Sequence, residues 1–169
     1  MKNQYVKEIK GNLLDFPEGI NILCHCANAF TTFGGGIALS IKERYPEAYN
    51  ADCKTTSGDK EKMGTISYAR IKGSKKENPQ FIANIYGQYE TSSEKRAVDY
   101  EAIARGIERV YLGAKGKKVS KDSDLEYTVG FPRLMGSALA KGDWPIIRQM
   151  IWTYALKYKV KTVIVDYNG

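Results

Sequence analysis

The sequence is poor in the residues from which metal sites and disulfides are built. It has a single histidine, His25, and three cysteines, and it has no Cys-x-x-Cys pair. A structural zinc site usually takes four Cys or His ligands, so neither a metal nor another cofactor is expected. Cys24 and Cys26 lie two positions apart on an expected strand and point the same way, which is poor geometry for a disulfide. We therefore expect free thiols in a reducing cytosol.

Long apolar runs are also missing. No segment approaches the ~20 apolar residues that are needed to span a membrane, so no membrane partner is expected. The first five residues lead directly into a strand pattern, which is unlike a signal peptide and favours a cytoplasmic protein. The length of 169 residues and the hydrophobic content of 43% suit one domain, residues 1–169, and we expect a monomer.

The net charge of +7 points toward an anionic partner, such as a nucleotide or a nucleic acid. Much of the positive charge lies in two lysine-rich segments, residues 72–77 and 115–121, whose composition is typical of solvated loops. A nucleic-acid surface usually interleaves aromatic residues with arginine, and these segments do not. A nucleic-acid partner is therefore left open but is not expected.

Strand and helix patterns alternate along the chain. Strands are expected in residues 5–9, 20–26, 64–71, 81–86, 126–134 and 161–166. Helices are expected in residues 36–45, 46–53, 98–113 and 143–158. This order, with its strand-rich middle, predicts an α/β fold with helices on both faces of a mixed, mainly parallel sheet.

Residues 22–38 combine a strand, a glycine turn and the start of a helix. The apolar run turns polar at His25 and Asn28 and then passes through three consecutive glycines, residues 34–36. Glycines let backbone amides approach a ligand closely, and the first amides of a helix are unpaired and carry partial positive charge. The segment is therefore expected to bind an anion such as a phosphate, although it is neither a P-loop nor a dinucleotide fingerprint.

Loops that follow five expected strands should meet at one edge of the sheet, because ligands of such sheets bind at the carboxyl ends of the strands. These loops are residues 11–12, 28–36, 87–93, 136–142 and Tyr167. The sequence thus predicts one composite ligand site that is assembled from segments far apart in the chain.

Three motifs in these loops make the chain resemble the macrodomain family, the ADP-ribose-binding module. Gly11-Asn12-Leu13 resembles the family's Gly-Asp-Ile/Leu. His25-Cys26-Ala27-Asn28, followed by Gly34-Gly35-Gly36-Ile37-Ala38, resembles Asn-Ala-Ala-Asn and Gly-Gly-Gly-Val/Ile-Ala. Residues 132–144 resemble Pro-Arg-Ile-Gly-x-Gly-Leu-Ala-Gly-Gly-x-Trp, with one extra residue at Met135. The resemblance covers the whole chain and implies a three-layer α/β/α macrodomain fold and an ADP-ribose ligand.

Within that resemblance each loop has an expected role. The implied ligand-binding residues are Gly11, Asn12, Leu13, Gly34, Gly35, Gly36, Ile37, Gly136, Ser137, Ala138, Leu139, Ala140 and Tyr167. Asn12 would hold adenine through its amide oxygen, and Tyr167 would stack on the base unless it is a frayed end. Residues 136–139 would offer backbone amides to the diphosphate, and the glycines 34–36 would wrap the distal ribose and a terminal phosphate.

His25 and Asn28 are the candidate catalytic residues. A histidine with an ordinary pKa near ~6.5 suits general acid–base chemistry, with Glu90, Asp99 or Asp143 as its carboxylate partner. The alternative is that this lone histidine on a buried strand is simply satisfied by a neighbouring side chain. Asn28 would either hydrogen-bond the distal ribose or serve as a turn residue at the end of the strand.

The His25-x-x-Asn28 form most resembles the ADP-ribose 1''-phosphate phosphatase branch of macrodomains. The branch that cleaves ADP-ribose from glutamate esters uses an Asp in the second glycine loop, where this chain has Ala140, and a Lys after a middle strand, where this chain has none directly following residues 81–86. The resemblance therefore implies a phosphatase acting on ADP-ribose 1''-phosphate. The alternatives are a hydrolase that removes ADP-ribose from protein or nucleic acid, and a non-catalytic ADP-ribose reader.

Overall fold

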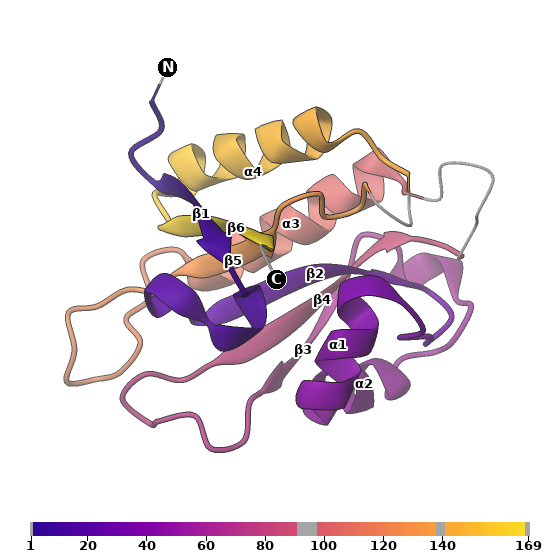
Figure 1. Ribbon diagram of the computed structural model, residues 1–169, viewed down its shortest axis with the longest axis horizontal. Coiled ribbons are helices and arrows are strands. Elements are labelled where there is room, and N and C mark those ends of the chain that lie inside the picture. Colours follow the sequence, from indigo (N-terminus) through magenta and orange to yellow (C-terminus); the bar gives the residue numbers. More distant parts are fainter. Residues whose placement is uncertain (1, 91–97, 138–140, 168–169) are drawn as a thin grey trace.

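The computed structural model describes residues 2–90, 98–137 and 141–167 and shows a six-stranded sheet between helices (Figure 1). The strands are β1 (Val6–Gly11), β2 (Ile22–Asn28), β3 (Ile66–Arg70), β4 (Phe81–Gln88), β5 (Val129–Pro132) and β6 (Thr162–Tyr167). The α-helices are α1 (Gly36–Arg44), α2 (Pro46–Cys53), α3 (Tyr100–Ala114) and α4 (Trp144–Tyr158). Single-turn 3-10 helices are η1 (Leu13–Asp15), η2 (Pro17–Gly19) and η3 (Lys60–Lys62).

The order of strands across the sheet is β1-β6-β5-β2-β4-β3. The first four neighbouring pairs are parallel, and only β3 runs antiparallel to its neighbour, β4. Residues 71–80 join β3 to β4, and this connection is too short for the crossover that a parallel pair needs. The predicted mixed, mainly parallel sheet is confirmed.

Helices cover both faces of the sheet (Figure 1). On one face α3 and α4 pack over a core cluster that includes Ile85, Ile103, Ile107, Ile147 and Ile151. On the other face α1 and α2 pack over a second cluster that includes Leu23, Phe33, Ile41, Ala48 and Ile82. The predicted three-layer α/β/α arrangement is therefore confirmed.

The central strand β2 divides its side chains between the two faces with the period of two that strands impose. Cys24 belongs to the cluster under α3 and α4, whereas Leu23 and Ala27 belong to the cluster under α1 and α2. His25 lies on the α1/α2 side, with its ring centroid 5.2 Å from that of Phe33. Burial raises the pKa of the Cys26 thiol to about 12, so this free cysteine is a packing residue rather than a nucleophile.

Every strand differs from its predicted bounds at one end or both. β1 (predicted 5–9) ends at Gly11, β3 (predicted 64–71) spans Ile66–Arg70, and β6 (predicted 161–166) is shifted by one residue. β2 and β4 each extend two residues further toward their carboxyl ends, to Asn28 and Gln88. β5 is shorter than the predicted 126–134 because the chain before it folds back on itself, with the amide of Val119 donating to the carbonyl of Leu125. A turn that contains Leu134 at a φ of 69° then ends the strand.

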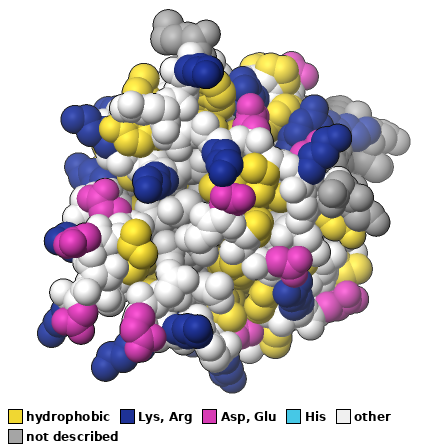
Figure 2. Space-filling view, turned by 60° about the vertical axis from the view of Figure 1, so that its left-hand side comes forward, with side chains coloured by type: hydrophobic (Ala, Val, Ile, Leu, Met, Phe, Trp, Pro, Cys, Tyr) yellow, Lys and Arg dark blue, Asp and Glu magenta, His cyan; other side chains and the backbone are white. Residues whose placement is uncertain are grey.

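The surface carries both signs of charge. On the face drawn in Figure 2, lysine and arginine side chains are interspersed with aspartate and glutamate. Exposed ion pairs such as Lys7–Glu18, at 2.9 Å, belong to this mixture. The net charge of +7 is therefore not gathered into one basic patch on this face. In the part of the chain that the structure describes, no helix combines the length and the apolar character required to cross a membrane.

Candidate functional site

The candidate site lies at the carboxyl edge of the parallel strands. Gly11, Asn28, Gln88, Pro132 and Tyr167 are the last residues of β1, β2, β4, β5 and β6. These five strands run in the same direction, so their carboxyl ends, and the described residues directly after them, lie at one edge of the sheet. The structure thus brings together the segments that the sequence motifs singled out.

Asn12 turns the chain out of β1 and begins η1. Its Oδ1 accepts a hydrogen bond from the backbone amide of Leu14 at 3.0 Å, which caps this short helix. An amide oxygen has two lone pairs, so the predicted contact with an adenine amino group would have to use the second one. The side chain of Leu13 is buried in the core, which leaves its backbone as the part that can face a ligand.

Asn28 closes the loop that leaves β2. Its Nδ2 donates to the carbonyl of Thr32 at 3.0 Å and to Thr32 Oγ1 at 2.7 Å, and its Oδ1 accepts from the amide of Phe30 at 2.8 Å. Both N–H groups of the side chain are therefore used inside its own loop. The geometry fits the turn-residue alternative, and the predicted contact with a ribose stays a prediction.

The glycines 34–36 form the approach to α1. Gly35, with a φ of −159°, is the N-cap residue, and no side chain of the described residues makes a capping hydrogen bond there. Gly36 has a φ of +58°, a conformation that glycine adopts without a steric penalty. Gly34 and Gly36 are exposed, whereas Ile37 packs against the core below. The first amides of this helix are thus left to solvent or to an anion, as the sequence predicts.

The second glycine loop follows β5. The amide of Gly142 donates to the carbonyl of Gly136 at 2.9 Å, which closes the loop, and Ser137 is held by a bond from its amide to Leu134 O. A Cβ on Gly142 would lie 2.7 Å from Val98 Cγ1 and 2.8 Å from Gly136 O, so glycine is required by close packing. The predicted ligand residues Ala138, Leu139 and Ala140 lie outside the described residues.

His25 is wholly buried rather than open to a ligand. Its Nε2 is 2.6 Å from Oδ1 of Asn84 on β4, and Nδ1 has no hydrogen-bond partner among the described residues. Burial lowers the pKa of this imidazole to about 4, so it is neutral near pH ~7. The geometry favours a histidine satisfied in the core, and the catalytic role stays a prediction.

The expected carboxylate partner of His25 is wrong, because its partner is the amide Asn84. Asp99 instead caps α3 by accepting from the amide of Ala102 at 3.1 Å. Asp143 is the N-cap residue of α4, as expected, but its side chain makes no capping bond.

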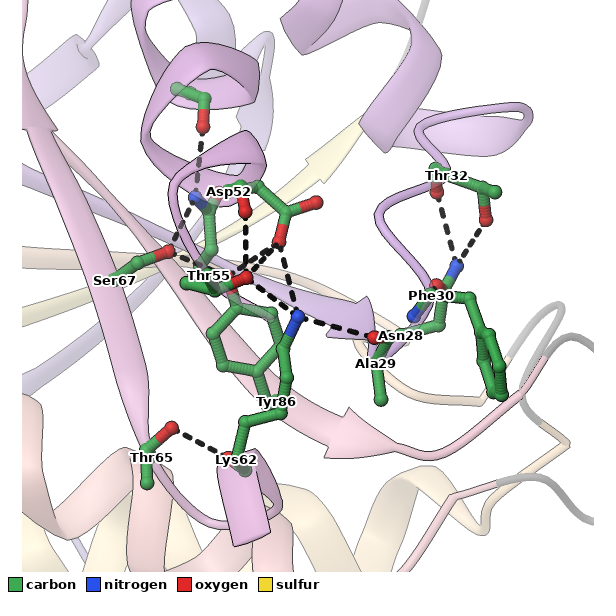
Figure 3. Close-up of polar contacts among 12 residues, drawn as sticks. Asn28, Ala29, Phe30, Thr32, Asp52, Thr55, Lys62, Thr65, Ser67 and Tyr86 are labelled. Carbon is green, nitrogen blue, oxygen red and sulfur yellow. Dashed lines mark hydrogen bonds and ion pairs between the residues drawn. The ribbon is translucent and has the colours of Figure 1, made fainter. Parts of the chain in front are cut away.

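A buried polar network that the motifs did not reveal lies under the loop after β2 (Figure 3). We use this name for His25, Asp52, Lys62, Ser67, Asn84 and Tyr86. Oη of Tyr86 is 2.5 Å from Oδ1 of Asp52 and 2.7 Å from Oγ of Ser67. Ser67 accepts from Asn84 Nδ2 at 3.0 Å. The one local signal was the position of Asp52, one helical turn after the buried Ala48 on the core side of α2.

Curated relatives of the chain come from a phage and from fungi. No family model matches the chain. An uncharacterized 17.5 kDa protein from the tk-vs intergenic region of Enterobacteria phage T4 is 30% identical over 165 residues, covering 96% of this chain and 97% of that protein. A 45-residue segment is 47% identical to an ADP-ribose 1''-phosphate phosphatase of Aspergillus oryzae, covering 27% of this chain and 22% of that enzyme.

Solved structures share the fold over nearly the whole chain. The macrodomain of Thermus aquaticus DarG matches with a TM-score of 0.65 and 18% identity, covering 97% of this chain and 98% of that chain. Thermosipho africanus DarTG, solved in complex with ADP-ribose, matches with a TM-score of 0.71 and 16% identity, covering 96% of this chain and 42% of that one. The chain belongs to the macrodomain family.

The linings of two surface hollows of this macrodomain do not include the glycines of the two glycine loops. One, of about 290 Å³, is lined by Glu8, Ile9, Lys10, Arg133, Ile164 and Asp166. The other, of about 620 Å³, lies along α4 between Pro145 and Tyr154. Among the described residues, no group of three or more His, Cys, Asp or Glu side chains is placed to hold a metal. The candidate site is therefore defined by the converging loops and their backbone amides.

Proposed function

We propose that this macrodomain binds ADP-ribose at the carboxyl edge of its sheet and hydrolyses ADP-ribose 1''-phosphate to ADP-ribose and inorganic phosphate. The observation that carries the proposal is the N-terminus of α1, where no described side chain makes a capping bond and where Gly34 and Gly36 are exposed, at the same edge as Asn12 and Tyr167. Helix N-termini bind phosphate through unpaired amides and the helix dipole. This end of the site suits the terminal phosphate and the distal ribose.

The opposite end of the site suits the adenine. Tyr167 ends β6 with 70% of its surface exposed, and it pairs in register with Gly11 of the neighbouring β1. The exposed ring of Tyr167 offers a stacking face to the base, and the side-chain amide of Asn12, the residue after Gly11, offers a hydrogen bond to the same base. The ADP-ribose complex of the structural neighbour DarTG and the segment shared with the Aspergillus phosphatase support the choice of ligand and of reaction.

In the phosphatase reaction, water adds to phosphorus, the bond from phosphorus to the 1''-oxygen breaks, and a proton from the water ends on the 1''-oxygen of the departing ADP-ribose. Negative charge grows on the phosphoryl oxygens and on the leaving oxygen, and fixed backbone amides can stabilise it without moving. His25 is neutral and buried, so its expected part is to support the loop. The chemistry would then depend mainly on the amides at the start of α1.

Two measurements test this proposal. Calorimetry with ADP-ribose should show saturable binding, and phosphate release from ADP-ribose 1''-phosphate should be catalysed by the wild type. His25→Gln, which keeps a neutral hydrogen-bonding side chain, should retain most of the rate. If the wild type releases no phosphate, the phosphatase assignment is refuted. If it does not bind ADP-ribose, the assignment of ADP-ribose as the ligand is refuted. A large loss of rate in a folded His25→Gln variant would restore the acid–base role.

A second candidate function is binding of ADP-ribose without turnover. The burial of His25 favours it, because the histidine that the sequence offered for proton transfer does not reach the surface. A reader would bind ADP-ribose tightly and leave ADP-ribose 1''-phosphate, ADP-ribosylated protein and ADP-ribosylated DNA intact. Release of free ADP-ribose from either modified polymer would instead support the hydrolase alternative.

A further inference from the structure

Lys62 has an unusual environment for a lysine. Its side chain is only 6% exposed, and its ammonium group lies under the loop that follows β2 (Figure 3). Nζ donates to the carbonyl of Ala29 at 3.1 Å and to Thr55 Oγ1 at 2.6 Å, and it lies 3.8 Å from Asp52 Oδ1. Lysines are almost never buried unless they are paired, so this placement requires an explanation.

Stability alone is a poor explanation for the Lys62–Asp52 pair. Removing two charges from water is costly, and apolar residues of similar size often serve stability as well as a buried ion pair does. The best-attested benefit of such pairs is that they fix one arrangement of the chain. The question is therefore which arrangement Lys62 fixes.

Lys62 fixes the backbone at Ala29, the residue directly after Asn28. Its side chain is fully buried, and its carbonyl accepts from Lys62 Nζ and also from the amide of Gly58 at 2.7 Å. Its own amide donates to the carbonyl of Tyr89 at 2.9 Å. Three contacts from two segments, residues 58–62 and Tyr89, thus hold this residue, and Lys62 makes its contact through a charged side chain. Ala29 in turn anchors the start of the loop that leads to the glycines 34–36.

The rest of the buried polar network holds the ammonium group in place. Asp52 is 0% exposed, and its Oδ1 is shared between Lys62 and the hydroxyl of Tyr86. Nζ of Lys62 also lies 4.5 Å from the centre of the Tyr86 ring, a favourable cation–π distance. The ion pair, the hydrogen bonds and the ring contact all hold Nζ of Lys62 in one position. In that position Nζ reaches the carbonyl of Ala29, at the start of the 28–36 loop.

We propose that Lys62 is a positioning residue of the ligand site, which holds the 28–36 loop in its binding-competent place by anchoring the carbonyl of Ala29. The inference rests on the proposed function, because the 28–36 loop is where the distal ribose and phosphate of ADP-ribose would bind. Lys62 touches no ligand in this scheme. It acts by raising the fraction of molecules in which the loop is correctly placed. The apparent affinity for ADP-ribose is proportional to that fraction, so it falls when the fraction falls.

The test separates affinity from stability by comparing two variants. Lys62→Met removes the ammonium but leaves Asp52 as an unpaired buried charge, so both stability and affinity should fall. The double variant Lys62→Met/Asp52→Asn removes both charges and should recover much of the stability. Its dissociation constant for ADP-ribose should nevertheless stay raised by roughly tenfold, as expected if the competent fraction falls to about a tenth. Lys54→Met, at an exposed position of the same segment, is the matched control and should bind as the wild type does.

A merely structural role predicts a different pattern. Affinity would then follow stability, so a double variant with recovered stability and wild-type affinity would overturn the proposal. Amide hydrogen exchange gives a readout without ligand, because residues 28–36 should exchange faster in the double variant than in the wild type. Failure of the wild type to bind ADP-ribose would overturn the proposed function alone. Unchanged exchange in residues 28–36 would overturn the role of Lys62 whether or not the ligand binds.

Discussion

Acid should destabilise this macrodomain through its one histidine. His25 is wholly buried, and burial lowers the pKa of its imidazole to about 4, against an ordinary value of 6.5 that the unfolded chain should show. Between these two values the unfolded chain binds a proton that the folded protein does not. The stability contributed by neutral His25 is therefore complete above pH ~6.5, falls as the pH drops, and is lost by pH ~4.

The size of the effect follows from the gap between the two pKa values. The gap is about 2.5, and each unit of pKa corresponds to about 1.4 kcal/mol, so acidification should cost roughly 3 kcal/mol of folding free energy. That is a large part of the roughly 5–15 kcal/mol by which most domains are stable. The hydrogen bond that the Nε2–H of His25 donates to Oδ1 of Asn84 partly offsets the lowering of this pKa by burial.

Urea unfolding of the wild type and of His25→Gln, between pH ~7.5 and pH ~4, measures the effect. Carboxylates also titrate in this range, but the two proteins carry the same carboxylates, so the difference between the two curves isolates the histidine. The advantage of the wild type over His25→Gln should shrink by roughly 3 kcal/mol as the pH falls. Parallel curves would show that His25 titrates as an exposed histidine does, and the buried placement would then be refuted.

Three further predictions concern glycines. Gly35→Glu should abolish ADP-ribose binding in calorimetry, because a carboxylate would occupy the anion position before α1, whereas the exposed control Lys54→Glu should bind normally; unchanged affinity in Gly35→Glu would contradict the placement of the site. Gly142→Ala should lower the free energy of unfolding by about 1–3 kcal/mol, since its Cβ would lie 2.7 Å from Val98 Cγ1. Gly113→Ala should raise the free energy of unfolding by roughly 0.5–1 kcal/mol, because this position in α3 is helical and no heavy atom lies within 4 Å of an added Cβ. A lower melting temperature of this variant would contradict the open space around Gly113.

The local pattern of the sequence was enough to predict the order of elements and the faces of the central strand. In β2 the alternation with a period of two puts Cys24 and His25 on opposite faces, as the structure has them, because that rule depends only on the backbone. The edge at which the loops meet followed from strand direction, which the alternation of strands and helices predicts. The end of β5 was placed wrongly because it depends on a turn at Leu134, whose positive φ no hydrophobic pattern shows.

The environment of the site could not be read in the same way. Lys62 lies in a polar segment with no apolar pattern that would signal burial, and its contact with Ala29 joins residues 33 positions apart. Asp52 and Tyr86 are separated by 34 positions, and neither alone signals a buried charge. The buried polar network forms only when α2, β3, β4 and the segment that contains Lys62 pack together in the folded protein. The two alternatives for His25 stayed open at the level of sequence for the same reason, because its partner Asn84 lies on a strand 59 positions away.

The polar groups nearest the glycine turn are largely occupied in holding the loop itself. Both N–H groups of Asn28 bind Thr32, and the ammonium of Lys62 binds the carbonyl of Ala29. A group that is already bound and buried has little left for proton transfer, whereas the amides at the start of α1 have no side-chain cap. The phosphatase proposal therefore predicts an unequal pair of results: a small loss of rate for His25→Gln, and a large one for any change that moves the 28–36 loop. A large loss of rate for His25→Gln, with only a small loss from a displaced loop, would instead mean that His25 transfers a proton in the reaction. The histidine would then have to leave the core during turnover.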